Sequence, residues 1–135
     1  QKAIDDYSMA IEIDPGDADA YYGRGYDYGE MGEHQKAIDD YSMAIAIDPQ
    51  FTNAYYNRGY DYDELGEYQK AIDDYSMAIA IDPQNAKAYY NRGYDYKLLG
   101  DYEQAIADYR KTLSVSDDPI LTSMTEDALK DLVDD

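Results

Sequence analysis

The chain has no cysteine and no tryptophan, and it contains one histidine and one phenylalanine. Without cysteine, a disulfide, a cysteine-based zinc site and a thiol nucleophile are all excluded. No apolar run approaches the roughly 20 residues that a membrane-spanning helix needs. No signal-peptide pattern opens the sequence, which begins within a repeated motif, and we expect a cytoplasmic location.

Basic residues are scarce. The chain has 11 Lys and Arg against 30 Asp and Glu, which gives a formal net charge of −19. A nucleic-acid surface needs clustered cations to neutralise phosphates, so nucleic acid is a poor partner, and an anionic membrane is poor for the same reason. The charge favours a basic partner, attracted over a long range that salt shortens.

The sequence is instead rich in repetition and in tyrosine, with 18 tyrosines in all. The segment QKAIDDYSMAIAIDPQ begins at Gln35 and again at Gln69, and a slightly altered copy begins at Gln1. The segment AYYxRGYDY recurs with the same spacing from Ala20, Ala54 and Ala88. Self-similarity at a fixed period of 34 residues is typical of a repeat protein.

Each period holds two helical stretches. The first is predicted to end at a glycine that tolerates a left-handed turn, as Gly66 does after residues 52–65. The second is predicted to stop before a proline, as residues 69–82 stop before Pro83. In this second stretch Ala71, Ile72 and Tyr75 belong to one apolar stripe, whereas Asp73 and Asp74 lie off it.

Small and large residues alternate through each period in a fixed order. The order resembles the tetratricopeptide repeat (TPR) family, and it is carried by Tyr55, Gly59, Tyr62, Gly66, Tyr68, Ala71, Tyr75, Ala78 and Pro83. The resemblance covers about residues 1–116. One departure is arginine at positions 24, 58 and 92, where the family often has leucine. We expect the arginine stems to pack and their charged heads to reach water.

The resemblance implies an all-α fold, a right-handed α-solenoid of stacked antiparallel helix pairs with about 3.5 repeats and a C-terminal capping helix. We expect one domain over residues 1–135. It divides into a half repeat at 1–17, full repeats at 18–51, 52–85 and 86–118, and a cap at 119–135. Within the cap, helical spacing is evident from about Ser123 to Val133.

In such a solenoid the first helix of each repeat lines a concave groove. Six tyrosines, spaced one turn apart in pairs, are predicted to face this groove with polar neighbours. The predicted peptide-binding residues are Tyr22, Tyr26, Tyr56, Asn57, Tyr60, Asp63, Lys87, Tyr90, Asn91, Tyr94 and Lys97. Tyrosine offers a rigid apolar area and a hydroxyl at little entropic cost. An alternative is that these tyrosines are tolerated surface residues.

Some TPR relatives hold a peptide C-terminal carboxylate with a clamp of Lys, Asn and Arg. Asn57 and Lys87 match two clamp positions, but Tyr22, Tyr26 and Asn91 replace the others. Losing two of three cations in an acidic chain disfavours carboxylate capture.

Other chemistry finds little support. His34 stands where Tyr68 and Tyr102 stand in later repeats, so it is interpreted as a packing residue. The acidic cluster that includes Asp61 lacks calcium-loop spacing and is interpreted as a solvated face. Adjacent carboxylates such as Asp39 and Asp40 diverge on a helix and do not act together as acid and base. We therefore expect no enzyme activity, no catalytic or metal site and no cofactor.

Two functions from different classes remain. The first is a protein–protein interaction scaffold that binds a peptide segment with apolar and basic side chains in the tyrosine-rich groove. The alternative is a self-assembling structural solenoid that forms homo-oligomers end to end through the N-terminal helix, where Ile4, Tyr7 and Ile11 have no predicted cover.

Overall fold

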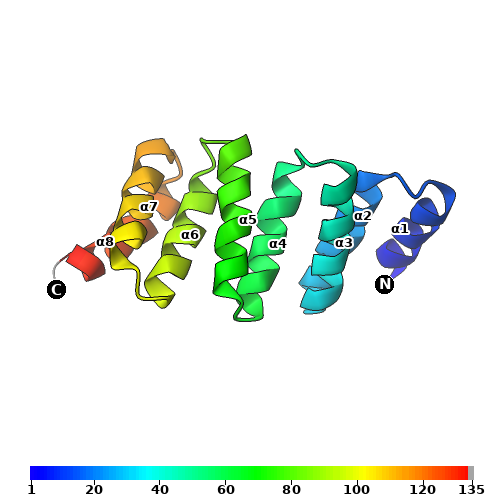
Figure 1. Cartoon of the computed structure of the whole chain (residues 1–135), viewed down its shortest axis with the longest axis horizontal. Coiled ribbons are helices and arrows are strands. Elements are labelled where there is room, and N and C mark those ends of the chain that lie inside the picture. The colour runs from blue at the N-terminus through cyan, green and yellow to red at the C-terminus, as the bar shows by residue number, and fades with distance from the viewer. Residues whose placement is uncertain (134–135) are drawn as a thin grey trace. The chain divides into compact units, whose positions relative to one another are not determined.

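The computed structural model describes residues 1–133, which form eight α-helices and no strand. The chain divides into two compact units, Gln1–Glu67 and Tyr68–Asp135 (Figure 1). The first unit holds α1 (Lys2–Ile13), α2 (Ala18–Glu30), α3 (His34–Ile47) and α4 (Thr52–Glu64). The second holds α5 (Tyr68–Ile81), α6 (Ala86–Leu98), α7 (Tyr102–Val115) and α8 (Pro119–Val133).

Within each unit, every helix packs against the next one along the chain. In the first unit α1 contacts α2, α2 contacts α3 and α3 contacts α4. In the second, α5 contacts α6, α6 contacts α7 and α7 contacts α8. The prediction of an all-α fold built from stacked helix pairs is confirmed.

The helix ends follow from the predicted glycines and prolines. Gly32, Gly66 and Gly100 have φ angles of +79°, +76° and +83°, a region that costs glycine little. The turn after α2 closes with a bond of 2.9 Å from the Glu33 amide to the Tyr28 carbonyl. Helices α1, α3 and α5 each end two residues before a proline.

The core consists of tyrosine rings packed on small residues. Tyr41 is 2% exposed, and Tyr75 and Tyr109 are fully buried. A Cβ added at Gly93 would lie 3.0 Å from the Tyr109 ring, so this position has room only for glycine unless the ring moves. Helices α6 and α7 therefore approach each other closely at this glycine.

The last helix begins earlier than its helical spacing suggested. It starts at Pro119, not near Ser123. Pro119 occupies the first helical position, where its missing N–H has no intrahelical partner to lose. The Asp118 carboxylate caps the helix by accepting a 2.9 Å bond from the Ile120 amide. The predicted cap extends to residue 135, and residues 134–135 lie outside the described residues.

None of the helices in the described part of the chain is long and apolar enough to cross a bilayer.

Candidate functional site: a tyrosine-bearing face and an acidic cavity

The first helix of each full repeat carries two tyrosines one turn apart, and the second of each pair is exposed. The exposed fractions are 48% for Tyr26 on α2, 51% for Tyr60 on α4 and 45% for Tyr94 on α6. The first tyrosine of each pair, at positions 22, 56 and 90, is half-buried. Each helix thus presents one anchored ring and one open ring.

Tyr22 is held in place by three neighbours in the first unit. Its ring stacks on Phe51 with centroids 4.8 Å apart and lies 5.7 Å from the Tyr41 ring. Its hydroxyl accepts a 2.7 Å hydrogen bond from the Asn57 side-chain amide. Burial raises the pKa of Tyr22, so the hydroxyl stays neutral. In the second unit, Tyr90 lies 5.5 Å from the Tyr109 ring.

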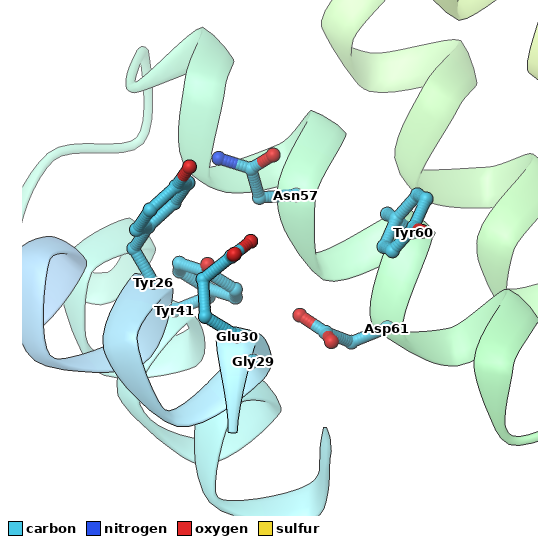
Figure 2. Close-up of a pocket in the computed structure, with 7 residues that line it drawn as sticks. All are labelled: Tyr26, Gly29, Glu30, Tyr41, Asn57, Tyr60 and Asp61. Carbon is cyan, nitrogen blue, oxygen red and sulfur yellow. The ribbon is translucent and has the colours of Figure 1, made fainter. Parts of the chain in front are cut away.

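The first unit contains a small cavity between α2, α3 and α4, with a volume of about 50 Å³. We name it the Asp61 cavity. Two open tyrosine rings and two carboxylates surround it (Figure 2). Its lining residues are Tyr26, Gly29, Glu30, Tyr41, Asn57, Tyr60 and Asp61. It thereby brings together three of the predicted binding residues with four that were not predicted.

Asp61 is 3% exposed, although it was interpreted as part of a solvated acidic face. That interpretation is wrong for Asp61, because α4 turns this side chain toward the cavity. The carboxylate is stabilised by His34, whose Nδ1 lies 2.7 Å from Asp61 Oδ1. His34, which was interpreted as a packing residue, is therefore the polar partner of a buried carboxylate.

The side chains in and around the cavity carry negative charge. Burial raises the pKa of Asp61, the His34 hydrogen bond lowers it less, and the nearby charges of Glu64 and Glu30 raise it further. Glu64 also raises the pKa of the neighbouring Tyr60 hydroxyl. No lysine or arginine is among the lining residues. A cationic group would therefore be favoured there.

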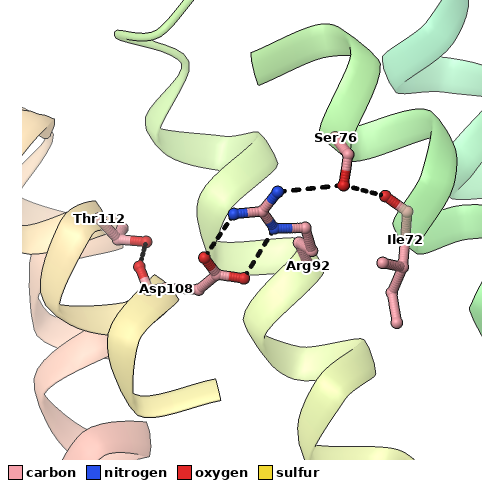
Figure 3. Close-up of polar contacts among 5 residues, drawn as sticks. All are labelled: Ile72, Ser76, Arg92, Asp108 and Thr112. Atoms are coloured by element: carbon pink, nitrogen blue, oxygen red, sulfur yellow. Dashed lines mark hydrogen bonds and ion pairs between the residues drawn. The ribbon is translucent and has the colours of Figure 1, made fainter. Parts of the chain in front are cut away.

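A second set of buried carboxylates serves the packing. In the second unit, Arg92 donates two bonds of 2.8 and 2.7 Å to Asp108 and one of 3.0 Å to the Ser76 hydroxyl (Figure 3). In the first unit, Arg24 makes the equivalent bonds to Asp40 and to Ser8. The arginine heads, expected only to reach water, bind buried carboxylates at these two positions.

This arrangement explains the departure from leucine. Asp40 and Asp108 are each 5% exposed, and each carboxylate meets both nitrogens of a guanidinium fork. The paired carboxylate raises the pKa of Arg24 and of Arg92 above its ordinary value. Position 24 therefore joins three helices through polar bonds instead of apolar contact. We find here a structural role and no feature that receives a ligand.

The remaining predicted residues occupy different settings. Asp63 and Asn91 are half-buried, and Lys87 is exposed. In the second unit the Lys97 ammonium lies 5.8 Å from the centre of the Tyr94 ring. Lys97 also lines a shallow hollow of about 400 Å³ with Tyr102, Asp131 and Leu132. The role of the predicted residues in binding stays a prediction.

The cavity was not predicted from the sequence, although one feature of the sequence points to it. Position 29 holds glycine where the next two repeats hold Asp63 and Lys97. A Cβ at Gly29 would lie 3.2 Å from Asp61 Oδ1. A small residue at a position where the other repeats have larger residues leaves open space beside its helix.

Comparison with known proteins gives a consistent result. The family model for the tetratricopeptide repeat matches residues 18–51, 52–85 and 86–118, and a TPR repeat model matches residues 1–32. No curated protein sequence matches the chain.

Three solved structures illustrate the likeness. A crystal structure of MamA protein is 34% identical, with a TM-score of 0.79 over 82% of this chain and 61% of that chain. This chain therefore spans less than two thirds of that MamA chain. The first TPR of Spaghetti (RPAP3), bound to the HSP90 peptide SRMEEVD, is 26% identical, with a TM-score of 0.80 over 87% of this chain and 90% of that chain. The Arabidopsis OM64 TPR domain is 28% identical, with a TM-score of 0.80 over 86% of this chain and 96% of that chain.

Proposed function

Because the chain belongs to the tetratricopeptide repeat family, we propose that it is a non-catalytic scaffold that binds a peptide segment of a partner protein. The proposed binding surfaces are the tyrosine-bearing face of α2 and α4 in the first unit and, taken by itself, the tyrosine-bearing face of α6 in the second. The cytoplasmic location expected from the sequence belongs to the same proposal.

The observation that carries this proposal is the open ring repeated on each first helix. Tyr26, Tyr60 and Tyr94 are each about half exposed, whereas the core tyrosines of the second helices are buried. A large aromatic ring left in water at equivalent positions of every repeat is typical of a binding surface, because it buries much area at small entropic cost. The half-buried ring beside each open ring keeps the surface rigid.

The partner segment is apolar and basic. The chain carries a net charge of −19, and the cavity beside Tyr26 and Tyr60 is lined by two carboxylates. The Spaghetti TPR holds a peptide with an acidic end, SRMEEVD. Such a peptide would be repelled by the acidic face of this chain's first unit.

A second function, self-assembly, has one observation in its favour. Ile4, which was expected to lack cover, is 4% exposed, so that expectation is wrong, and Tyr7 and Ile11 are half-buried. Exposed apolar side chains on α1 are instead Ile13, at 83%, and Met9, at 62%. Two apolar side chains on one helix offer a contact for another copy of the chain. Light scattering over a range of concentrations separates the two functions: growth in mass supports assembly, and a constant monomer mass argues against it.

The binding proposal is tested by selecting peptides from a random display library on the purified chain and measuring their affinity by fluorescence anisotropy. We expect the double replacement Tyr26→Ala and Tyr60→Ala to weaken binding of a selected peptide by about tenfold or more, the size of a hot-spot loss. Helicity, measured by circular dichroism, stays unchanged because neither ring is buried.

The matched control is Tyr102→Ala, which removes a ring that is 55% exposed but lies on a second helix. We expect it to leave the affinity unchanged. Equal losses from the control and from the double replacement, or no loss from either, would show that the tyrosine-bearing face is not the binding surface.

A further inference from the structure

We propose that the Asp61 cavity is a specificity pocket that receives the ammonium group of a lysine side chain from the bound partner segment. The inference rests on the proposed function, because it assigns a ligand to one place on the same surface. It follows from the charge, the size and the repeat-specific shape of the cavity.

The charge of the lining favours a cation with hydrogen-bond donors. Glu30 and Asp61 bring carboxylates to two sides of the space between the rings of Tyr26 and Tyr60 (Figure 2). His34 occupies Asp61 Oδ1 and leaves the second carboxylate oxygen to accept from a ligand. An ammonium group has three donors to share among such acceptors.

Asn57 adds a further acceptor at the cavity. Its amide nitrogen is engaged by the Tyr22 hydroxyl, so the amide has its oxygen to offer to a ligand. The anchored tyrosine therefore orients the amide, and the amide in turn orients the side chain that enters. The ring faces of Tyr26 and Tyr60 attract a cation as well.

The size of the cavity selects lysine over arginine. Its volume of about 50 Å³ exceeds the roughly 10–15 Å³ that a single water molecule needs by the same measure. A compact ammonium group fits this space, whereas the broad planar guanidinium of arginine does not enter without displacing the walls.

The second unit contains a lysine of its own beside the equivalent tyrosine. Lys97 stands one period of 34 after Asp63 and two periods after Gly29, and Tyr94 stands likewise after Tyr60 and Tyr26. There the Lys97 ammonium lies 5.8 Å from the Tyr94 ring centre. Where the chain has no lysine of its own, at Gly29, the space beside the tyrosine stays open for a lysine from the partner.

The test titrates the isotope-labelled full chain with N-acetyl-lysine N-methylamide and follows the backbone amides by NMR. The matched probe, N-acetyl-norleucine N-methylamide, has the same four-carbon side chain but lacks the ammonium group. We expect lysine to shift the amides of Gly29, Asn57 and Asp61 in a saturable way, and norleucine to leave them unmoved. The arginine derivative should bind more weakly than lysine.

Three variants sharpen this test. Glu30→Gln should weaken lysine binding by roughly three- to fivefold, the range for a partly exposed ion pair. Glu33→Gln removes the same charge from an exposed position outside the cavity lining and should leave the affinity for the lysine derivative unchanged. Gly29→Ala keeps every charge but narrows the cavity beside Asp61, and should also weaken binding. Equal effects of the two glutamate variants, or equal shifts from norleucine, would overturn the proposal.

The outcome is separable from that of the proposed function. If library-selected peptides bind the tyrosine-bearing face but tolerate replacement of each lysine by norleucine, the pocket assignment is wrong and the scaffold function stands. If the lysine derivative binds the cavity while no peptide is selected, the scaffold function fails and the cavity remains a lysine site.

Discussion

Asp61 shows how one buried carboxylate is tolerated in this chain. It is 3% exposed, and its carboxylate lies 2.7 Å from the ring nitrogen of His34. Taking a carboxylate out of water costs free energy unless a hydrogen bond offsets it. Here the cost outweighs the offset, because burial raises the pKa of Asp61 in spite of His34. The folded protein therefore holds a proton on Asp61 more tightly than the unfolded chain does.

This predicts a pH dependence of stability with a definite sign. The free energy that Asp61 contributes is highest at low pH, where the carboxyl is protonated in both states. It falls as pH rises from the ordinary value of 3.8 through the raised pKa. Subtracting the free energy of unfolding of Asp61→Asn from that of the wild type should isolate this effect, because asparagine does not titrate.

Urea unfolding at a series of pH values measures both free energies. The difference between wild type and variant should become less favourable to the wild type as pH rises. A difference that stays constant, or that grows in favour of the wild type, would show that His34 compensates fully for the burial of Asp61.

Individual charged residues were the hardest to place from the sequence. The two adjacent aspartates of α3 look alike by position, yet Asp39 is exposed and Asp40 is buried against Arg24. The periodicity of apolar residues does not reveal this, because the burial of Asp40 depends on an arginine 16 positions away. A prediction would have needed to pair the arginine that replaces leucine with a carboxylate of the adjacent helix.

Helix identity and helix ends, in contrast, follow largely from local residues. Glycines with positive φ and prolines after the second helices place most ends within a residue or two of those predicted. Helix α8 is the exception, because Pro119 begins a helix instead of following one. Proline has both uses, and only the preceding Asp118, an N-cap residue, favoured the start.

The cap of α8 can be tested directly. Asp118→Ala removes the carboxylate that accepts the Ile120 amide at 2.9 Å, and should lower the free energy of unfolding by about 1 kcal/mol. Asp117→Ala removes the same charge one residue earlier. It should leave the free energy of unfolding nearly unchanged, as surface substitutions usually do.

Urea unfolding followed by circular dichroism measures both variants. Similar losses in the two would indicate that the net charge near α8 matters and that the hydrogen bond at Asp118 does not.

At the scale of the molecule, the repeat explains which surface features all three full repeats share and which belong to one repeat alone. A period of 34 residues gives each first helix the same anchored and open tyrosines. Differences at single positions then give each repeat its own surface: glycine, aspartate and lysine at positions 29, 63 and 97. The repeat and its tyrosines could be predicted because they recur. The Asp61 cavity could not, since it depends on side chains from three helices.

The central claim is that the tyrosine-bearing face binds a partner segment, and mapping such a segment on the labelled chain by NMR tests it most directly. With a library-selected peptide, the largest amide shifts should fall on α2, α4 and α6, around Tyr26, Tyr60 and Tyr94. Shifts concentrated instead on α3 and α5, around the exposed Met43 and Met77, would contradict the claim.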